Sequence, residues 1–237
     1  MNRFLRSGVI AAALLVSAVG PLLSQYDYQK FTGKPNPGLR EKIRKGAVGD
    51  LFAKWCVDGA AEAFSTSFLA AQGKAPAVDP DDPDSIFRYL AWQGMYCASS
   101  VTDGNAKTAW VEGVQGDGLH EIVIARVNTR KPVRIWSGYG KSAATFANNA
   151  RPKKVRVFVL TGRKDADRCT ESGEMLANLC VAARADAVLK EKNGYQPLPI
   201  PKHTLKATED VTLIAVEILA VYPGKKYRDT CISEIGN

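Results

Sequence analysis

The segment Asp103–Thr108 (DGNAKT) holds the side chains of this sequence best suited to binding an ion. Gly and Asn tolerate positive φ, so the Asp-Gly-Asn run predicts a tight loop with inward-facing carbonyl oxygens. Asp103 adds a carboxylate and Thr108 a hydroxyl. A hard cation such as calcium takes roughly six to eight oxygens of these kinds, more than one loop supplies. A calcium site would therefore need a carboxylate from elsewhere in the chain, and an ordinary turn is the simpler interpretation.

No motif of the sequence indicates a catalytic centre. The two histidines, His120 and His203, lie near no nucleophile signature, and GxSxG, HExxH and P-loop motifs are all missing from the sequence. Glu121 follows His120, but neighbouring side chains of a strand point to opposite faces. We therefore predict that the chain is not an enzyme.

Composition and charge predict a folded domain without a nucleic-acid partner. The chain has 237 residues, 46% of them hydrophobic, and a formal net charge of +8. That is enough apolar material for a packed core. Its lysines and arginines are scattered rather than gathered into a basic stripe, which disfavours nucleic acid as a partner. Mild attraction to anionic envelopes or acidic glycans is compatible with this charge.

Residues 1–24 resemble a secretory signal. Arg3 and Arg6 precede the apolar stretch Gly8–Val16, and small residues follow it. An uncleaved membrane anchor is the alternative, since the apolar stretch falls just short of spanning a bilayer comfortably. We expect the body to be secreted or periplasmic, with no stable membrane insertion after cleavage.

The five cysteines fit an oxidising compartment better than a zinc site, because they show no CxxC or Cys/His spacing. Cys169 and Cys180 flank a polar segment, and we predict a disulfide between them. Cys56, Cys97 and Cys231 cannot all pair with one another, so their pairing is left open.

The hydrophobic pattern divides the rest of the chain into two domains, 25–85 and 86–237. A polar linker over 25–38 is followed by apolar residues at helical spacing over Leu39–Gly73, and residues 75–85 form a proline- and aspartate-rich hinge. Beyond the hinge, β-branched runs separated by turn residues predict strands of an antiparallel sandwich or barrel. These runs are Leu119–Val127, Val133–Trp136, Val155–Leu160 and Val211–Val221. The stretch Glu174–Lys192 fits either a helix or a loop followed by a strand that starts near Ala187.

Several short motifs together resemble a discoidin-like domain (F5/8 type C, galactose-binding-like). They are most similar to the glycan-binding, or translocation, domain that accompanies bacterial NAD glycohydrolases. The motifs are Ala98–Ser100, Asp103–Asn105, Thr108–Gly113, Gly116–Gly118, Ser137–Ser142, Asn148–Lys153 and Val221–Ile235. The resemblance spans about residues 89–235. It implies a mainly β fold, a discoidin-like jelly-roll β-sandwich, here preceded by a short α-helical N-terminal segment.

The resemblance also implies a structural calcium ion. In discoidin-like modules the opening loop and a glutamate of the last strand commonly share this ion. Carried over to this sequence, its ligands are Ser100, Asp103, Asn105, Thr108 and Glu234. In the proteins that this chain resembles, the NAD glycohydrolase activity belongs to a separate domain, so the resemblance implies no catalysis here.

Carbohydrate binding needs an aromatic platform and a few planar polar groups at a rim of loops. Two turn-rich segments offer such groups, and the alternative is that they are ordinary turns. The candidate ligand-binding residues are Tyr139, Lys141, Asn148, Asn149 and Arg151. Trp110 and Trp136 lie inside predicted strands and are assigned to the core. We expect a non-catalytic module that recognises carbohydrate or a cell-envelope component; the alternative is a structural protein–protein interaction module without a glycan ligand.

Overall fold

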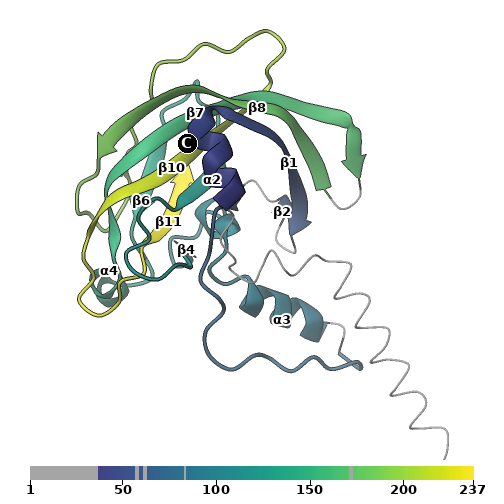
Figure 1. The fold of residues 1–237 in the computed structure, drawn as a ribbon. Coiled ribbons are helices and arrows are strands. Elements are labelled where there is room, and N and C mark those ends of the chain that lie inside the picture. The colour runs from purple at the N-terminus through teal and green to yellow at the C-terminus, as the bar shows by residue number, and fades with distance from the viewer. Residues whose placement is uncertain (1–36, 57–58, 61–62, 83, 171–172) are drawn as a thin grey trace, which may run out of the picture.

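The computed structural model describes residues 37–237 except 57–58, 61–62, 83 and 171–172 (Figure 1). Within these residues two antiparallel sheets form a β-sandwich, which confirms the predicted fold class. The larger sheet has the strand order β2-β1-β8-β7-β10-β5-β3, and the smaller has the order β4-β11-β6-β9.

The strands are β1 (Ala47–Cys56), β2 (Gly59–Ala60), β3 (Ala63–Ser65), β4 (Trp110–Val111), β5 (Ile122–Arg126), β6 (Arg134–Ser137), β7 (Arg151–Thr170), β8 (Gly173–Val188), β9 (Gln196–Pro197), β10 (Val211–Tyr222) and β11 (Cys231–Gly236). The helices are α2 (Pro37–Lys45), α3 (Asp84–Gln93), the 3-10 helix η2 (Ala98–Val101) and α4 (Ala143–Asn148).

The predicted strands are confirmed. β5, β6, β7 and β10 lie within or over the four β-branched runs, and the ambiguous stretch Glu174–Lys192 forms most of β8. β8 pairs with β7 on one side and with β1 on the other. A segment whose composition suits a helix is thus held as a strand by hydrogen bonding along both edges, because tertiary context overrides weak local propensity.

Both faces of the larger sheet are buried. Side chains of a strand alternate between faces, and in β5 Val123 and Ala125 face the smaller sheet, in a core that includes Trp110. Ile122 and Ile124 belong to a second core on the opposite face. Because both faces of β5 are buried, its sequence is an unbroken apolar run and does not alternate between apolar and polar residues.

Helix α2 covers that second face. Leu39 and Ile43, at 6% and 0% exposure, pack there with Phe158 and Leu213 of the sheet. Figure 1 shows α2 beneath the arch that β1, β8 and β7 form as the larger sheet curls. The N-terminal part of the described chain therefore completes the fold.

The expected helical segment Leu39–Gly73 is wrong beyond Lys45. Gly46, at φ 84°, ends α2 in the left-handed conformation that favours glycine. The chain then enters β1, which pairs with β8, and later β3, which pairs with β5. The ladder of β1 is irregular around Gly49, which also has positive φ, and such irregularity disturbs the two-residue alternation that normally marks a strand. The described part of 25–85 thus supplies strands to the same sheet as 86–237.

Helix α3 stands apart from both sheets in Figure 1. Trp92 Nε1 donates to the carbonyl of Gln72 at 3.0 Å, which ties the helix to the preceding loop. Phe87 is 48% exposed, and the buried residue of α3 is Ser85. No helix among the described residues is long and apolar enough to cross a membrane.

Candidate metal and ligand site

The loop Asp103–Thr108 gathers its oxygens as the sequence suggested. Asp103 Oδ1 accepts a hydrogen bond from the backbone N–H of Asn105 at 2.8 Å. Thr108 Oγ1 lies 2.7 Å from Asp103 Oδ2 and 2.6 Å from the carbonyl oxygen of Asn105. Gly104, at φ 72°, makes the tight reversal. The loop presents a carboxylate, a hydroxyl and a carbonyl side by side.

The fold brings Glu234 of β11 to this loop. Glu234 is 4% exposed, and its Oε1 has no hydrogen-bond partner. Burial raises the pKa of Glu234 to about 7, and the neighbouring Asp103 acts in the same direction, while the backbone N–H groups of Asn105 and Gly104 oppose it. A buried carboxylate therefore lies beside a second carboxylate with one oxygen unsatisfied.

These residues could hold a hard cation. The described residues contain no cluster of three or more His, Cys, Asp or Glu side chains suited to a metal. The oxygens here come instead from two carboxylates, a hydroxyl and a carbonyl, a mixture that calcium accepts. Ser100 is buried in η2, just before the loop, with 6% exposure.

A second loop is fastened to the first through Ser233. Its Oγ donates to the carbonyl of Ala106 at 3.1 Å and accepts from the N–H of Gly140 at 2.9 Å. Gly140 also packs so closely against Trp136 that a Cβ there would lie 2.8 Å from the indole. Any change in the loop Asp103–Thr108 is therefore transmitted to the loop around Gly140.

The candidate ligand-binding residues differ in how accessible their side chains are to a ligand. Lys141 is exposed, whereas Tyr139 is half-buried against Val111 and Cys231, and burial raises its pKa to about 12. The carbonyl of Asn148 accepts from the N–H groups of Lys226 and Tyr227, at 3.1 and 2.8 Å. Asn148 therefore uses its backbone to hold a neighbouring loop.

The side chains of Asn149 and Arg151 make hydrogen bonds within the protein. Asn149 Nδ2 donates to the carbonyl of Thr145 at 2.9 Å. Arg151 is 7% exposed; it donates to the carbonyls of Asn149 and Pro223, at 2.9 and 3.2 Å, and pairs with Glu191. Arg151 would have to give up these contacts to bind a ligand directly. Ligand binding by all five candidate residues stays a prediction.

Two aromatic side chains that the sequence did not single out as ligands lie on the outer side of the smaller sheet. The assignment of Trp136 to the core is wrong, because β6 alternates and buries Ile135, leaving Trp136 partly exposed. Tyr195 is 36% exposed and meets the Trp136 ring edge-on at 5.2 Å. The alternation of Arg134, Ile135 and Trp136 places Trp136 on the outer face once Ile135 is assigned to the core. Trp110, by contrast, is fully buried as expected.

A sequence model of the NAD glycohydrolase translocation F5/8 type C domain matches residues 88–236. The chain belongs to this family. The match starts close to the predicted boundary at residue 86 and confirms the resemblance. It leaves out α2 and β1 to β3, so in this chain the larger sheet of the F5/8 type C domain is extended and covered by residues that precede the family match.

Comparison with solved structures finds a similarity to a mutant arabinofuranosyltransferase AftD from Mycobacteria, determined by single-particle cryo-electron microscopy. The two are 14% identical with a TM-score of 0.32, over 78% of this chain and 11% of that chain. A similarity this low supports no conclusion about function. No curated protein matched the chain.

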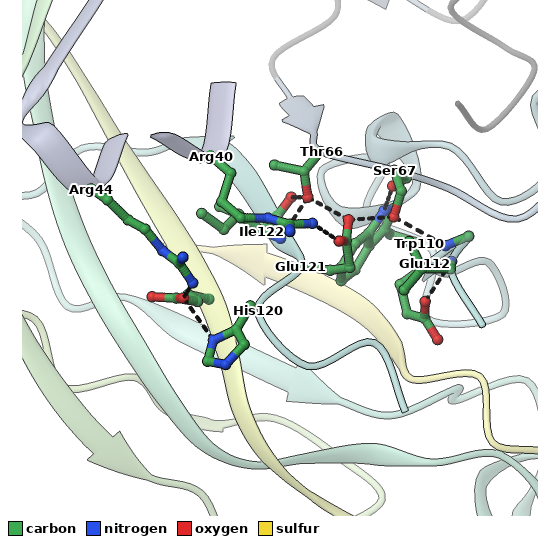
Figure 2. A network of polar contacts seen from close by, with 12 residues as sticks. Arg40, Arg44, Thr66, Ser67, Trp110, Glu112, His120, Glu121 and Ile122 are labelled. Atoms are coloured by element: carbon green, nitrogen blue, oxygen red, sulfur yellow. Dashed lines mark hydrogen bonds and ion pairs between the residues drawn. The ribbon is translucent and has the colours of Figure 1, made fainter. Parts of the chain in front are cut away.

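In this F5/8 type C domain, two buried glutamates anchor α2 (Figure 2). Arg40 pairs with Glu121, which also accepts from Thr66 Oγ1 at 2.6 Å and Ser67 Oγ at 2.5 Å. Glu121 is 1% exposed. Both of its oxygens are therefore satisfied within the protein.

The second anchor is Glu217, also 1% exposed, which accepts from Arg44 Nη2 at 2.5 Å. His120 Nδ1 lies 3.1 Å from the same oxygen of Glu217. Arg40 and Arg44 are four residues apart and so lie on one side of α2. His120 and Glu121 thus have different partners, Glu217 and Arg40, in the contacts that hold α2.

Among the cysteines whose side chains the structure describes, Cys97, Cys180 and Cys231 form no disulfide with one another. In the β7–β8 ladder Cys180 lies opposite Thr161, well before Cys169 on the same strand. Strand residues advance roughly 3.3 Å each, so this register does not favour a bond between them. The side chains of Cys56 and Cys169 lie outside the described residues, and the disulfide stays a prediction.

Proposed function

We propose that this chain is a secreted or periplasmic, non-catalytic recognition module that binds carbohydrate or another cell-envelope component and holds a calcium ion structurally. Membership of a translocation F5/8 type C family supports a binding role. Both histidines have structural partners: His120 contacts Glu217, and His203 lies 2.8 Å from Thr129 Oγ1 and 3.0 Å from the carbonyl of Pro201.

The observation that carries the calcium proposal is the unpartnered oxygen of Glu234. A buried polar atom without a partner costs free energy, and two adjacent carboxylates repel each other. A cation between Glu234 and Asp103 would relieve both costs. Thr108 would add its hydroxyl, and Asn105 and Ser100 would add carbonyl oxygens. The ion would fix the loop to β11 and, through Ser233, support the loop around Gly140.

Calorimetry and thermal melting test this proposal. We expect calcium to bind and to raise the melting temperature by several degrees relative to chelator, since a ligand that binds only the folded state stabilises it. Glu234→Gln should abolish most of that increase. Asp117→Asn is the matched control, because Asp117 is an exposed-loop acid paired with Arg228 at 2.8 Å. Identical melting in calcium and in chelator would show that no calcium site forms.

A second candidate, a protein-docking module without a glycan ligand, is favoured by α3. This helix carries apolar side chains, yet Phe87 is 48% exposed, and contiguous exposed apolar groups often mark interaction sites. Capture of one defined partner that is lost in Phe87→Ser, together with a blank glycan array, would select this candidate over carbohydrate recognition.

A further inference from the structure

We propose that an acidic carbohydrate binds across Trp136 and Tyr195, on the outer side of the smaller sheet beside the loop Asp103–Thr108. This inference rests on the proposed function and names both the surface and the class of sugar. It differs from the rim of Tyr139 and Arg151 that the sequence suggested.

The aromatic surface is built by three neighbouring strands. Trp136 of β6 pairs with Glu234 of β11, and Tyr195 directly precedes β9, which pairs with β6. The two rings meet edge-on with centroids 5.2 Å apart. Sugars bind proteins by laying their C–H faces on such aromatic groups, because the ring surface is apolar and rigid.

Some of the polar groups around these rings are bonded to each other, and others are left without a partner. Trp136 Nε1 donates to Asn193 Oδ1 at 3.1 Å. Among the described residues, the amide nitrogen of Asn193 and the hydroxyl of Tyr195 find no hydrogen-bond partner. Asn149 Nδ2 and the two terminal nitrogens of Arg151, in contrast, are bonded to backbone carbonyls and Glu191. Unengaged donors beside exposed aromatic rings are the features of a ligand surface.

The charges around the rings favour an acidic sugar. The Arg134 guanidinium lies 5.0 Å from the centroid of the Tyr195 ring, and its Nη2 donates to the carbonyl of Asn237 at 2.9 Å. Lys107 and Lys141 are exposed and directly follow Ala106 and Gly140, the two loop residues that meet next to Trp136. Cations gathered at a surface attract carboxylates, and Arg in particular binds them through paired hydrogen bonds.

Two features connect this surface with the proposed calcium site. Tyr195 meets the ring of Trp136, which lies opposite Glu234 in the β6–β11 ladder, and after burial the charge of Glu234 helps to raise the pKa of Tyr195. Gly140 packs on the Trp136 indole and is hydrogen-bonded to Ser233. An ion bound to the carboxylates would thus remove negative charge from the edge of the surface and hold Trp136 in place.

The test uses hyaluronan oligosaccharides, which carry a carboxylate on alternate sugars, and the same oligosaccharides after reduction of the carboxyl groups. Binding to the full chain is measured by calorimetry in calcium. We expect Tyr195→Ala to weaken hyaluronan binding about tenfold, the loss expected for one aromatic contact and its buried area. Arg134→Gln and carboxyl reduction should each weaken it by a similar factor.

Tyr227→Ala is the matched control, because Tyr227 is 43% exposed and its N–H bonds the carbonyl of Asn148, at the alternative rim. It should leave binding unchanged. Trp136→Phe keeps an aromatic ring at this half-buried position but removes the indole nitrogen that bonds Asn193. The melting temperature separates a lost contact from a lost fold. We expect this variant to melt like the wild type and to bind hyaluronan more weakly.

The outcomes separate this inference from the proposed function. If glycans bind but Tyr195→Ala has no effect and Tyr227→Ala does, the surface is wrong and carbohydrate recognition stands. If reduced oligosaccharides bind as tightly as hyaluronan, the acidic class is wrong. If the wild type binds neither these oligosaccharides nor any sugar of a glycan array, the glycan-recognition proposal itself fails.

Discussion

The molecule buries carboxylates in two opposite ways. Beneath α2, Glu121 and Glu217 each receive an arginine from the helix. Glu217 Oε2 and Glu234 Oε1 both lack a hydrogen bond, but the charged group beside Glu234 is the carboxylate of Asp103 rather than an arginine. A buried charge is tolerated only when it is paired or neutralised. The first region supplies its own counter-charge and is structural, whereas the second lacks one and fits an ion from outside.

The largest effect is expected from a substitution that removes a counter-charge under α2. Arg40→Ala would leave Glu121, 1% exposed, as a buried carboxylate without its cation. We expect a loss of about 3 kcal/mol in the free energy of unfolding, the range found when one partner of a buried pair is removed. Urea unfolding measures this loss.

Lys45→Ala is the control for that change. Lys45 lies on the same helix but pairs with the exposed Glu41, at 3.1 Å. Its removal should cost less than about 0.5 kcal/mol, as for other exposed helix pairs. Equal losses in the two variants would show that burial of Glu121 does not decide the energetics.

Glu112 is a third case, a buried carboxylate with no cation at all. It is 0% exposed and accepts only from the N–H groups of Val114 and Thr230, at 2.9 and 3.3 Å. Burial raises its pKa to about 7. The folded state therefore retains a proton that the unfolded state releases at lower pH.

The sign of the pH dependence of stability follows from this difference in pKa between the folded and unfolded states. The wild type should lose stability as pH rises from about 4.5 to about 7, because ionisation is easier in the unfolded chain. Glu112→Gln removes the part of this dependence that comes from Glu112, leaving that of Glu234, and should be more stable than the wild type by about 2–3 kcal/mol at pH 8. Unfolding curves at pH 5 and pH 8 measure the contrast. The same difference between the two proteins at both pH values would contradict it.

Much of the sandwich follows from local patterns. β5, β6 and β10 are β-branched runs between turn residues, and such runs are typical of strands. The loop Asp103–Thr108 carries its own turn chemistry. Its meeting with Glu234 was expected from a family motif, since nothing local links a loop to a strand so far along the chain.

The features that local patterns do not predict depend on contacts between segments that are distant in the sequence. β1 has an irregular ladder around Gly49, so its apolar spacing imitates a helix. The pairing of Arg40 with Glu121 joins α2 to the residue directly before β5. The local sequence of neither segment specifies that pairing. Trp136 faces outward because Ile135 faces the core, and a four-residue strand does not reveal which of its faces is buried.

The smallest predicted effect distinguishes the two regions by its sign. In chelator, Glu234→Gln should stabilise the fold by about 1 kcal/mol, because it removes the repulsion between Glu234 and Asp103. Glu121→Gln should destabilise it, because Arg40 loses its partner. Paired urea titrations of the two variants measure both changes. With calcium present, Glu234→Gln should turn from stabilising to destabilising, since the carboxylate is then a ligand. Loss of stability by Glu234→Gln in chelator would mean that the protein itself already satisfies this carboxylate, and the contrast between the two regions would disappear.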